Sequence, residues 1–252
     1  MGFNVTARAY EQFMGRYSEP LAAEFIALLG LQAGDRVLDV GCGPGAVASR
    51  LVDQLGLAQV SAVDPSEPFV AAVRARLPGL DARRAFAETL PFGDDEFNCA
   101  VAQLVVHFMK DPVAGLREMA RVTRSGGVVA ANVWDHAGGA GPLAVFWRAV
   151  ASLDPDAHDE SQLAGARQGH LVELFGRAGL HDVTESVLTV HVHYQDVEQW
   201  WLPFTLGVGP AGAYVARLGD PQRVELKAAC TKLLPPAPFD IAASAWTAVG
   251  RA

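Results

Sequence analysis

The residues best suited to chemistry stand close together between positions 39 and 45. Asp39 lies two residues before glycines that alternate as Gly41-x-Gly43-x-Gly45. Because glycine has no side chain, the backbone of such a turn can approach a ligand closely. A helix beginning directly after the turn would also point its free amide groups toward that ligand. The stretch therefore indicates a site for a nucleotide-type cofactor.

Two kinds of cofactor fit this turn. The spacing Gly41-x-Gly43-x-x-Ala46 matches the dinucleotide fingerprint, and Asp64 follows at a distance suited to a ribose. The Asp39 carboxylate at the mouth of the turn would repel a pyrophosphate, whereas it would attract an ammonium or sulfonium group. The signs of the charges thus favour S-adenosylmethionine over NAD(P).

The hydrophobic pattern predicts the elements that would hold these residues. The short apolar run 36–40 is typical of a buried strand, and residues 46–55 follow with helical spacing. A second strand is expected over 59–63, with Asp64 at its carboxyl end. Asp64 could hold a ribose or cap the next helix, but Ser66 already suits the cap. We therefore assign ribose binding to Asp64.

The nine residues VLDVGCGPG at 37–45 resemble the first motif of the class I S-adenosylmethionine-dependent methyltransferases. The resemblance runs through residues 37–135 and is to the small-molecule group, methyltransferase type 11, related to quinone-biosynthesis enzymes. It implies one α/β domain over residues 1–252, with a Rossmann-like, mostly parallel seven-stranded sheet, an antiparallel edge strand and helices on both faces. It also implies S-adenosylmethionine as methyl donor and S-adenosylhomocysteine as product.

The resemblance also assigns cofactor contacts to the glycine turn and to the ends of the following strands. Within residues 37–135 these are Asp39, Gly41, Cys42, Gly43, Asp64, Pro65, Ala87, Glu88, Gln103 and Leu104. One motif departs from the family, because relatives usually have Gly-Asp-Ala where this chain has Ala85-Phe86-Ala87. Without that carboxylate, we expect the Ala87 backbone, Glu88 and the Phe86 ring to contact the adenine.

Aromatic and basic residues crowd the segment that precedes the first strand. From the residues alone, this segment could be a surface-packed amphipathic turn followed by a helix from Ser18. The resemblance implies instead that residues 1–30 fold over the cofactor, with Tyr10, Arg16 and Tyr17 closing the site. Arg16 would then pair with the carboxylate of the methionine moiety, since a guanidinium matches a carboxylate in a bidentate fork.

Two side chains are candidates for a general base. His107 follows a strand expected over 97–103, and ligands bind beyond the carboxyl ends of such strands. Tyr194 is the second candidate, and either residue could simply be packed and hydrogen-bonded. A sulfonium is an activated methyl donor, so transfer mainly needs in-line positioning at about 3 Å. A base helps only when the attacking group carries a proton to be removed.

After Trp134 the resemblance weakens, so we expect this half of the chain to determine the specificity for the methyl acceptor. A long strand over 182–194 should pair with one near 240–249 to form the antiparallel edge. Between them, residues 196–236 form a helical insertion rich in aromatic side chains. The insertion could pack on the sheet edge, but we favour a lid over a small, apolar methyl acceptor.

Composition excludes several kinds of partner. The net charge is -8, with 28 acidic against 20 basic residues, which argues against a nucleic-acid partner. No apolar run reaches membrane-spanning length, and we expect no membrane insertion. The cysteines have no metal-binding spacing, and the pair His191 and His193 has no evident third ligand, so no metal is expected. We expect a cytoplasmic monomer or homodimer.

Two alternatives to a methyltransferase remain open at this point. An NAD(P)-dependent oxidoreductase is disfavoured, since the chain has no Tyr-x-x-x-Lys pair for hydride chemistry and Asp39 would have no role. The other alternative is a methyltransferase fold without catalysis, which uses the cofactor only for structure or sensing or has lost it, and Phe86 in the adenine loop is the feature that supports it.

Overall fold

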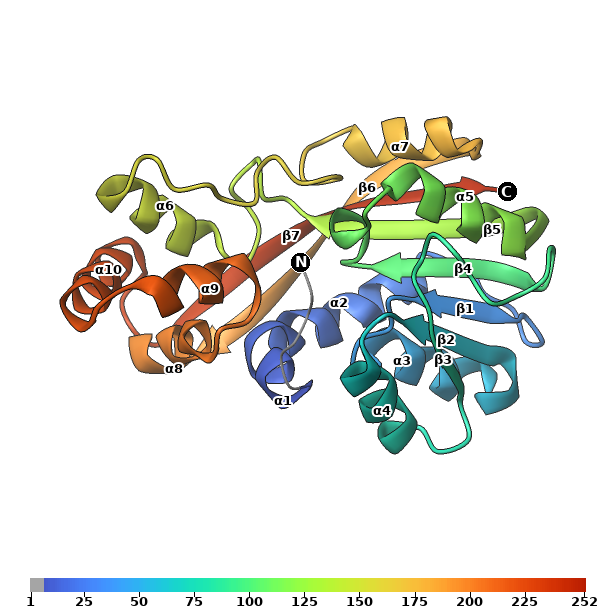
Figure 1. Cartoon of the computed structure of the whole chain (residues 1–252), viewed down its shortest axis with the longest axis horizontal. Helices are drawn as coiled ribbons and strands as arrows, with labels where there is room; N and C mark the ends of the chain where they lie inside the picture. The colour runs from blue at the N-terminus through green and yellow to red at the C-terminus, as the bar shows by residue number, and fades with distance from the viewer. Residues whose placement is uncertain (1–6) are drawn as a thin grey trace.

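The computed structural model describes residues 7–252, which contain one seven-stranded sheet with the order β3-β2-β1-β4-β5-β7-β6 (Figure 1). The strands are β1 (Val37–Val40), β2 (Val60–Asp64), β3 (Asp81–Arg84), β4 (Phe97–Gln103), β5 (Thr123–Trp134), β6 (His181–Tyr194) and β7 (Phe239–Arg251). Strands β1 to β5 pair in parallel, whereas β7 is antiparallel to both β5 and β6. The expected fold class is confirmed, with β7 placed one strand in from the edge.

Helices cover both faces of the sheet, as expected. One face is covered by α2 (Arg16–Ala27), α3 (Ala46–Leu55) and α4 (Glu67–Arg76). The other is covered by α5 (Pro112–Val122) and α7 (His170–Ala178). The side chains of β1 alternate between the two cores, with Val37 in the first and Leu38 in the second, because successive strand residues point to opposite faces.

The N-terminal segment is helical almost from the first described residue. It consists of α1 (Ala7–Tyr10), the π-helical turn η1 (Glu11–Gly15) and α2, with no break between them. A helix was expected only from Ser18, but the buried side chains Phe13 and Tyr17 extend the apolar face further toward the N-terminus. Residues 1–6 of the expected 1–30 segment lie outside the described residues.

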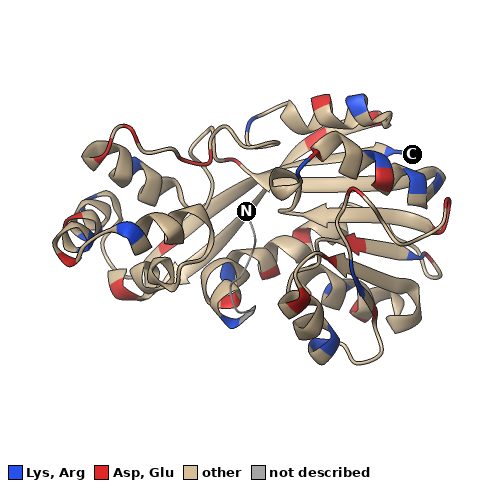
Figure 2. Ribbon diagram, viewed as in Figure 1, with Lys and Arg blue, Asp and Glu red and all other residues tan. Residues whose placement is uncertain are grey.

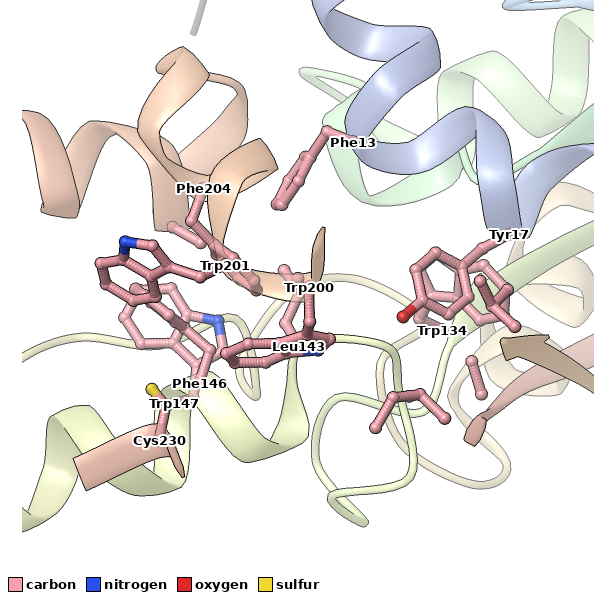
Figure 3. Close-up of a cluster of buried hydrophobic side chains, with 14 of the residues drawn as sticks. Phe13, Tyr17, Trp134, Leu143, Phe146, Trp147, Trp200, Trp201, Phe204 and Cys230 are labelled. Atoms are coloured by element: carbon pink, nitrogen blue, oxygen red, sulfur yellow. The ribbon is translucent and has the colours of Figure 1, made fainter. Parts of the chain in front are cut away.

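The insertion and α6 gather at the far ends of β6 and β7 (Figure 1). They comprise α6 (Ala144–Leu153), α8 (Val197–Trp201), η4 (Leu202–Leu206), α9 (Gly209–Arg217) and α10 (Asp220–Leu233). Their apolar side chains form one core, in which Phe146 stacks on Phe204 with centroids 4.7 Å apart. Phe13 points into this core from η1, and its ring meets Phe204 edge-on at 5.2 Å (Figure 3). The insertion is thus packed against the N-terminal segment.

Two short 3-10 turns, η2 (Leu57–Gln59) and η3 (Val106–Phe108), complete the elements used below. Charges of both signs are spread over the outer helices (Figure 2). Within residues 7–252, no helix combines the length and apolar character needed to cross a membrane. The same residues contain no cluster of ligating side chains that could hold a metal ion.

Candidate cofactor and acceptor site

The glycine turn connects β1 to α3 in a backbone conformation that needs glycine. Gly41 has φ +73° and donates its amide hydrogen to Val63 O at 2.8 Å. A Cβ atom at Gly41 would lie 2.4 Å from Val105 Cγ2, so the turn and the loop after β4 are packed as closely as backbone allows. Gly43, at φ +52°, faces open space instead. The turn is therefore fixed on one side and open on the other.

Asp64 joins the turn to the end of β2. One carboxylate oxygen accepts a hydrogen bond from Gly43 N at 2.9 Å, and the other accepts from Ser66 N at 2.8 Å. Burial raises the pKa of Asp64, and these two amide donors oppose the rise. A carboxylate has about four acceptor positions, so Asp64 can still accept two more hydrogen bonds.

Asp39 is buried directly beneath the turn, with only 1% of its surface exposed. The Ala48 amide at the start of α3 bonds to its carboxylate, but Oδ2 has no hydrogen-bond partner among the described residues. Burial raises the pKa of Asp39 to about 7, with a further contribution from the charge of Asp64. An unpaired buried carboxylate oxygen is costly, and a hydrogen-bond donor from a ligand would relieve that cost.

A pocket that is partly open to solvent lies above the turn and is called the glycine-turn pocket below. Its walls are Tyr10, Glu11, Gly15, Ser18 and Glu19 from the N-terminal segment, Asp39, Gly41, Cys42, Gly43, Pro44, Ala46 and Val47 from the turn and α3, and Gln103 from β4. Within residues 7–252, no lysine, arginine or histidine lines this pocket. The pocket therefore suits a cation better than an anion.

Gln103 brings a second unpaired acceptor to the same pocket. Its side-chain Nε2 donates to Ser18 O at 3.0 Å, which ties the end of β4 to α2. Its Oε1 is buried and has no partner in the part of the chain that the structure describes. Asp39 and Gln103 thus each offer a free acceptor oxygen at the strand ends beneath the N-terminal helix.

The structure brings most of the expected cofactor residues together, but not Arg16. Tyr10, Asp39, Gly41, Cys42, Gly43 and Gln103 all line the glycine-turn pocket. The Arg16 guanidinium lies instead over the ring of Tyr194, 4.3 Å from its centroid, and donates to His193 O at 3.3 Å. Arg16 is on the face of the helix that turns toward β6 and does not line the glycine-turn pocket. This arrangement therefore gives no support to its expected pairing with a cofactor carboxylate.

The residues expected around the adenine are also separated. Glu88 Oε1 accepts from the backbone amides of Lys110 and Asp111, at 2.7 and 3.2 Å, and so orders the loop before α5. Ala87 is buried in the core beneath α5, while Pro65 is exposed and accepts from Arg84 through its carbonyl. None of these residues lines the glycine-turn pocket.

Phe86 and Tyr10 offer aromatic surface at the same end of the sheet. The Phe86 side chain is 63% exposed. The ring of Tyr10 meets Phe69 edge-on, with centroids 5.4 Å apart, and the pKa of Tyr10 is raised by burial and by the charge of Asp64. Tyr10 therefore lies close to the Asp64 carboxylate, as a cover for the site requires.

The two candidate bases have environments that oppose basicity. Burial, together with the neighbouring His136, holds the pKa of His107 well below its ordinary value, so the imidazole is neutral and only weakly basic. The hydroxyl groups of Tyr17 and Tyr194 are hydrogen-bonded at 2.7 Å, and burial raises the pKa of both. Both tyrosines are therefore protonated at neutral pH and act as hydrogen-bonding groups.

A second space, an aromatic crevice, lies on the opposite side of the N-terminal helix. It holds only about 10 Å³ of free space, roughly the room of one water molecule. Its walls are Phe13, Met14, Tyr17, Pro142, Leu143, Tyr194, Trp200, Pro203 and Phe204. Leu104, expected at the cofactor, has φ +60° and packs into the apolar core around this crevice.

The sequence did not reveal Glu11, Gly15, Ser18 and Glu19 as pocket residues. They form one face of the helix built from η1 and α2, while Phe13, Met14 and Tyr17 form the opposite face. The regular spacing of the apolar side chains could have identified the polar face, had the helix been recognised before Ser18.

A mostly parallel sheet with a glycine turn after its first strand, and with buried carboxylates at the ends of the first two strands, is the arrangement expected of a class I methyltransferase. Residues 38–131 match the family described as "Methyltransferase domain". The chain is 32% identical over 183 residues to the malonyl-[acyl-carrier protein] O-methyltransferase of Pseudescherichia vulneris, covering 72% of this chain and 70% of that protein. The chain therefore belongs to the class I S-adenosylmethionine-dependent methyltransferase family.

Other relatives match a shorter part of the chain. The trans-aconitate 2-methyltransferase of Rhizobium rhizogenes is 31% identical over 132 residues, which cover 52% of this chain and 50% of that enzyme. An uncharacterized methyltransferase of Mycobacterium tuberculosis is 38% identical over 127 residues, which cover 50% of this chain and 49% of that protein. The chain thus spans about half the length of these two relatives.

Solved structures agree on the fold. A putative methyltransferase from Bacillus halodurans has a TM-score of 0.60 at 16% identity, covering 91% of this chain and 97% of that one. A phosphoethanolamine N-methyltransferase from Haemonchus contortus, solved with S-adenosyl-L-methionine, has a TM-score of 0.59 at 17% identity, covering 97% of this chain and 56% of that one. At these identities the likeness concerns the fold alone.

Proposed function

We propose that the protein binds S-adenosylmethionine in the glycine-turn pocket and transfers its methyl group to a small, largely apolar acceptor, releasing S-adenosylhomocysteine. The observation that carries this proposal is the electrostatic character of the pocket. It contains unpaired acceptor oxygens on Asp39 and Gln103 and the carboxylate of Glu11, and no basic side chain of residues 7–252 lines it. The Glu19 carboxylate, also in the wall, is paired with Arg76 at 2.6 Å. Such a pocket attracts an ammonium group and repels a pyrophosphate.

The residues of the chain have separate tasks in this proposal. Asp39 and Gln103 would accept hydrogen bonds from the amino group of the methionine moiety, and Asp64 would accept from the ribose hydroxyls. The bound cofactor supplies a sulfonium-activated methyl group. The protein's part is to hold the acceptor in line and to exclude water, which suits a site where His107 and Tyr194 are poor bases.

We further propose that the described part of the 1–30 segment and the 196–236 insertion act as covers. Tyr10, Glu11 and Ser18 already form one wall of the glycine-turn pocket, and the insertion meets the opposite face of the same helix through Phe204 and Phe13. A shift of this helix would therefore change both the wall of the glycine-turn pocket and the packing of the insertion. Relatives named trans-aconitate 2-methyltransferase and malonyl-[acyl-carrier protein] O-methyltransferase support methyl transfer as the class of reaction.

The proposal is tested by asking whether Asp39 recognises an amino group. Calorimetric titration at pH 8 would compare S-adenosylhomocysteine with the analogue that lacks only its α-amino group. A hydrogen bond to a charged group is worth about 1.5–3 kcal/mol, so we expect wild-type protein to prefer the amino compound roughly tenfold or more.

The matched variants are Asp39→Asn and Asp53→Asn, since Asp53 is an exposed carboxylate on α3, the helix that follows the glycine turn. We expect Asp39→Asn to lose most of the preference and Asp53→Asn to keep it. Equal affinity of the wild-type protein for the two compounds would contradict the assignment of the pocket.

A further inference from the structure

The Glu19 side chain, in the wall of the glycine-turn pocket, holds an arginine from another helix. Arg76, the last residue of α4, donates a hydrogen bond from Nη1 to Glu19 Oε1 at 2.6 Å. The aliphatic stem of Arg76 also passes close to the glycine turn, because its Cδ atom would be 3.8 Å from a Cβ atom at Gly45. Both side chains are 36% exposed. A guanidinium group therefore stands at the solvent-facing edge of a pocket whose described wall residues include no cation.

Arg76 has hydrogen-bond donors that Glu19 does not use. A guanidinium group carries several N–H donors and no acceptor. Within the described residues, the side chain of Arg76 makes its hydrogen bond to Glu19 through Nη1, which leaves the edge formed by Nε and Nη2 open. Arg83 shows in this protein what such an edge can hold, since its Nε and Nη2 each donate to the Asp81 carboxylate at 2.8 Å. Arg76 can therefore bind a second carboxylate in the same way without releasing Glu19.

The other arginines of the helices around the pocket are placed less favourably. The Arg16 guanidinium lies over an aromatic ring of β6. Arg74 donates twice to Ala82 O, at 3.1 and 2.6 Å, and is thereby tied to β3. Arg50 on α3 is exposed, and no described contact ties it to the pocket wall. Among the described arginines of α2, α3 and α4, Arg76 is thus the one that a wall residue holds against the pocket.

The pocket consequently combines acceptors in its interior with a donor group at its edge. Asp39 and Gln103 each present a buried acceptor oxygen without a partner among the described residues. Ala46 and Val47, the first residues of α3, line the same pocket, and the amides of a helix N-terminus favour a carboxylate. The amino-acid end of a ligand carries an ammonium and a carboxylate on one carbon atom. This arrangement can match both charges.

From this arrangement we propose that Arg76 binds the carboxylate of the cofactor's methionine moiety, the group that Arg16 was expected to bind. The assignment rests on the proposed binding of S-adenosylmethionine and adds a residue that determines the specificity for its amino-acid end. Glu19 is a positioning residue, because it holds the guanidinium at the edge of the pocket. Arg76 acts in binding and takes no part in the transfer of the methyl group.

The experiment compares S-adenosylhomocysteine with its decarboxylated analogue, which keeps the amino group and lacks only the carboxylate. Calorimetric titration of the whole chain at pH 8 would give both dissociation constants. A pocket lined by acidic side chains and lacking a counter-charge would repel the carboxylate and prefer the decarboxylated compound. With Arg76 as counter-charge, we expect the wild-type protein to prefer S-adenosylhomocysteine by roughly threefold to tenfold, the effect of one charged pair that is partly exposed to solvent.

The variants locate this preference at Arg76. Arg76→Gln should abolish it, and so should the double variant Glu19→Gln with Arg76→Gln, in which no Glu19 carboxylate is left unpaired. The matched control is Arg50→Gln, which removes an exposed arginine from α3 and should keep the preference. Arg16→Gln should keep it as well, because the Arg16 guanidinium lies over Tyr194.

The decarboxylated analogue also reports whether the variants are folded. We expect Arg76→Gln and the double variant to bind it within about threefold of wild type, since it carries no carboxylate for Arg76 to contact. Loss of both compounds in both variants would show that Arg76 has a structural role, and it would overturn the proposal.

Other results would overturn the proposal too. They are wild-type binding of the decarboxylated analogue that is as tight as that of S-adenosylhomocysteine or tighter, a preference that persists in Arg76→Gln, and a preference that is lost in Arg16→Gln or Arg50→Gln. Failure of the proposed function gives a different result. If the wild-type protein binds neither compound, the cofactor assignment is wrong, and if it binds both equally, the role of Arg76 alone is wrong.

Discussion

The backbone amide of Gly43 donates a hydrogen bond to the Asp64 carboxylate at 2.9 Å, and this contact links the glycine turn to the end of β2. Asp64 therefore has a structural role in addition to the proposed ribose contact. The same carboxylate orders the start of α4 through Ser66 N. Loss of Asp64 should consequently affect the turn even before any ligand binds.

Substitutions of Asp64 can separate its structural role from the proposed ribose contact. Asp64→Ala leaves the amides of Gly43 and Ser66 without their acceptor, and we expect it to lower the free energy of unfolding by about 1–3 kcal/mol and to abolish S-adenosylhomocysteine binding. Asp64→Asn keeps one acceptor oxygen and should lose less stability. Thermal unfolding and calorimetry measure the two effects. An Asp64→Ala protein that binds like wild type would exclude the ribose contact.

Replacing Asp39 should stabilise the protein and impair its binding. The pKa of Asp39 is raised from an unfolded value near 3.8 to about 7, so the folded state holds a proton that the unfolded state has already released over that range. Stability conferred by the protonated side chain is present below pH 4 and is lost as the pH rises through 7. At pH 8 we expect ligand-free Asp39→Asn to be more stable than wild type by about 2 kcal/mol, with little difference at pH 4.

The measurement is chemical denaturation of both proteins at the two pH values, without ligand. If Asp39→Asn is less stable than wild type at pH 8, then the buried carboxylate is paired in solution, and the free acceptor on which the cofactor assignment depends does not exist.

The tight contact at Gly41 predicts a contrast between two glycines. Alanine at either Gly41 or Gly43 takes a left-handed backbone, which costs about 1–2 kcal/mol, but only Gly41→Ala also brings a Cβ within 2.4 Å of Val105. We expect Gly41→Ala to be the more destabilising by about 1–3 kcal/mol. Adding Val105→Ala should recover part of the loss. Thermal melts check this order, and equal effects at the two glycines would show that Val105 moves aside freely.

His107 should stay uncharged throughout the neutral range. Burial lowers its pKa well below 6.5, so the folded state resists a proton that the unfolded state takes up as the pH falls through 6.5. The stability given by neutral His107 is therefore present above that value and lost on acidification. Two-dimensional NMR of the histidine rings, assigned with His107→Gln, should show no titration of His107 between pH 6 and 8. A titration midpoint near 7 would restore His107 as a candidate base.

The sequence predicts the elements around the cofactor turn because short-range patterns determine them. The alternating glycines, the helix 46–55 and the pairing of β6 with β7 all follow from turn residues and hydrophobic period. Ser66 shows the limit of such reasoning. It stands at the N-cap position as expected, but its Oγ is buried without a partner among the described residues. The Asp64 carboxylate instead accepts a hydrogen bond from Ser66 N at the start of α4.

The candidate site could be predicted only where it lies on consecutive residues. Asp39, Gly41 and Gly43 belong to one turn, and the structure brings them together. Arg16 was assigned from the family resemblance and its charge, but the direction of its side chain depends on which helix face meets Tyr194 of β6. The hydroxyl pair of Tyr17 and Tyr194 likewise depends on the packing of segments 177 residues apart, for which no local pattern exists.

The most direct test of the proposed cofactor is a calorimetric titration of the wild-type protein at pH 8 with S-adenosylhomocysteine and, separately, with NADH. The unpaired acceptors of Asp39 and Gln103 and the absence of basic side chains from the walls described within residues 7–252 predict that S-adenosylhomocysteine binds and NADH does not. Binding of NADH alone, or of neither compound, would contradict a methyltransferase that uses this pocket.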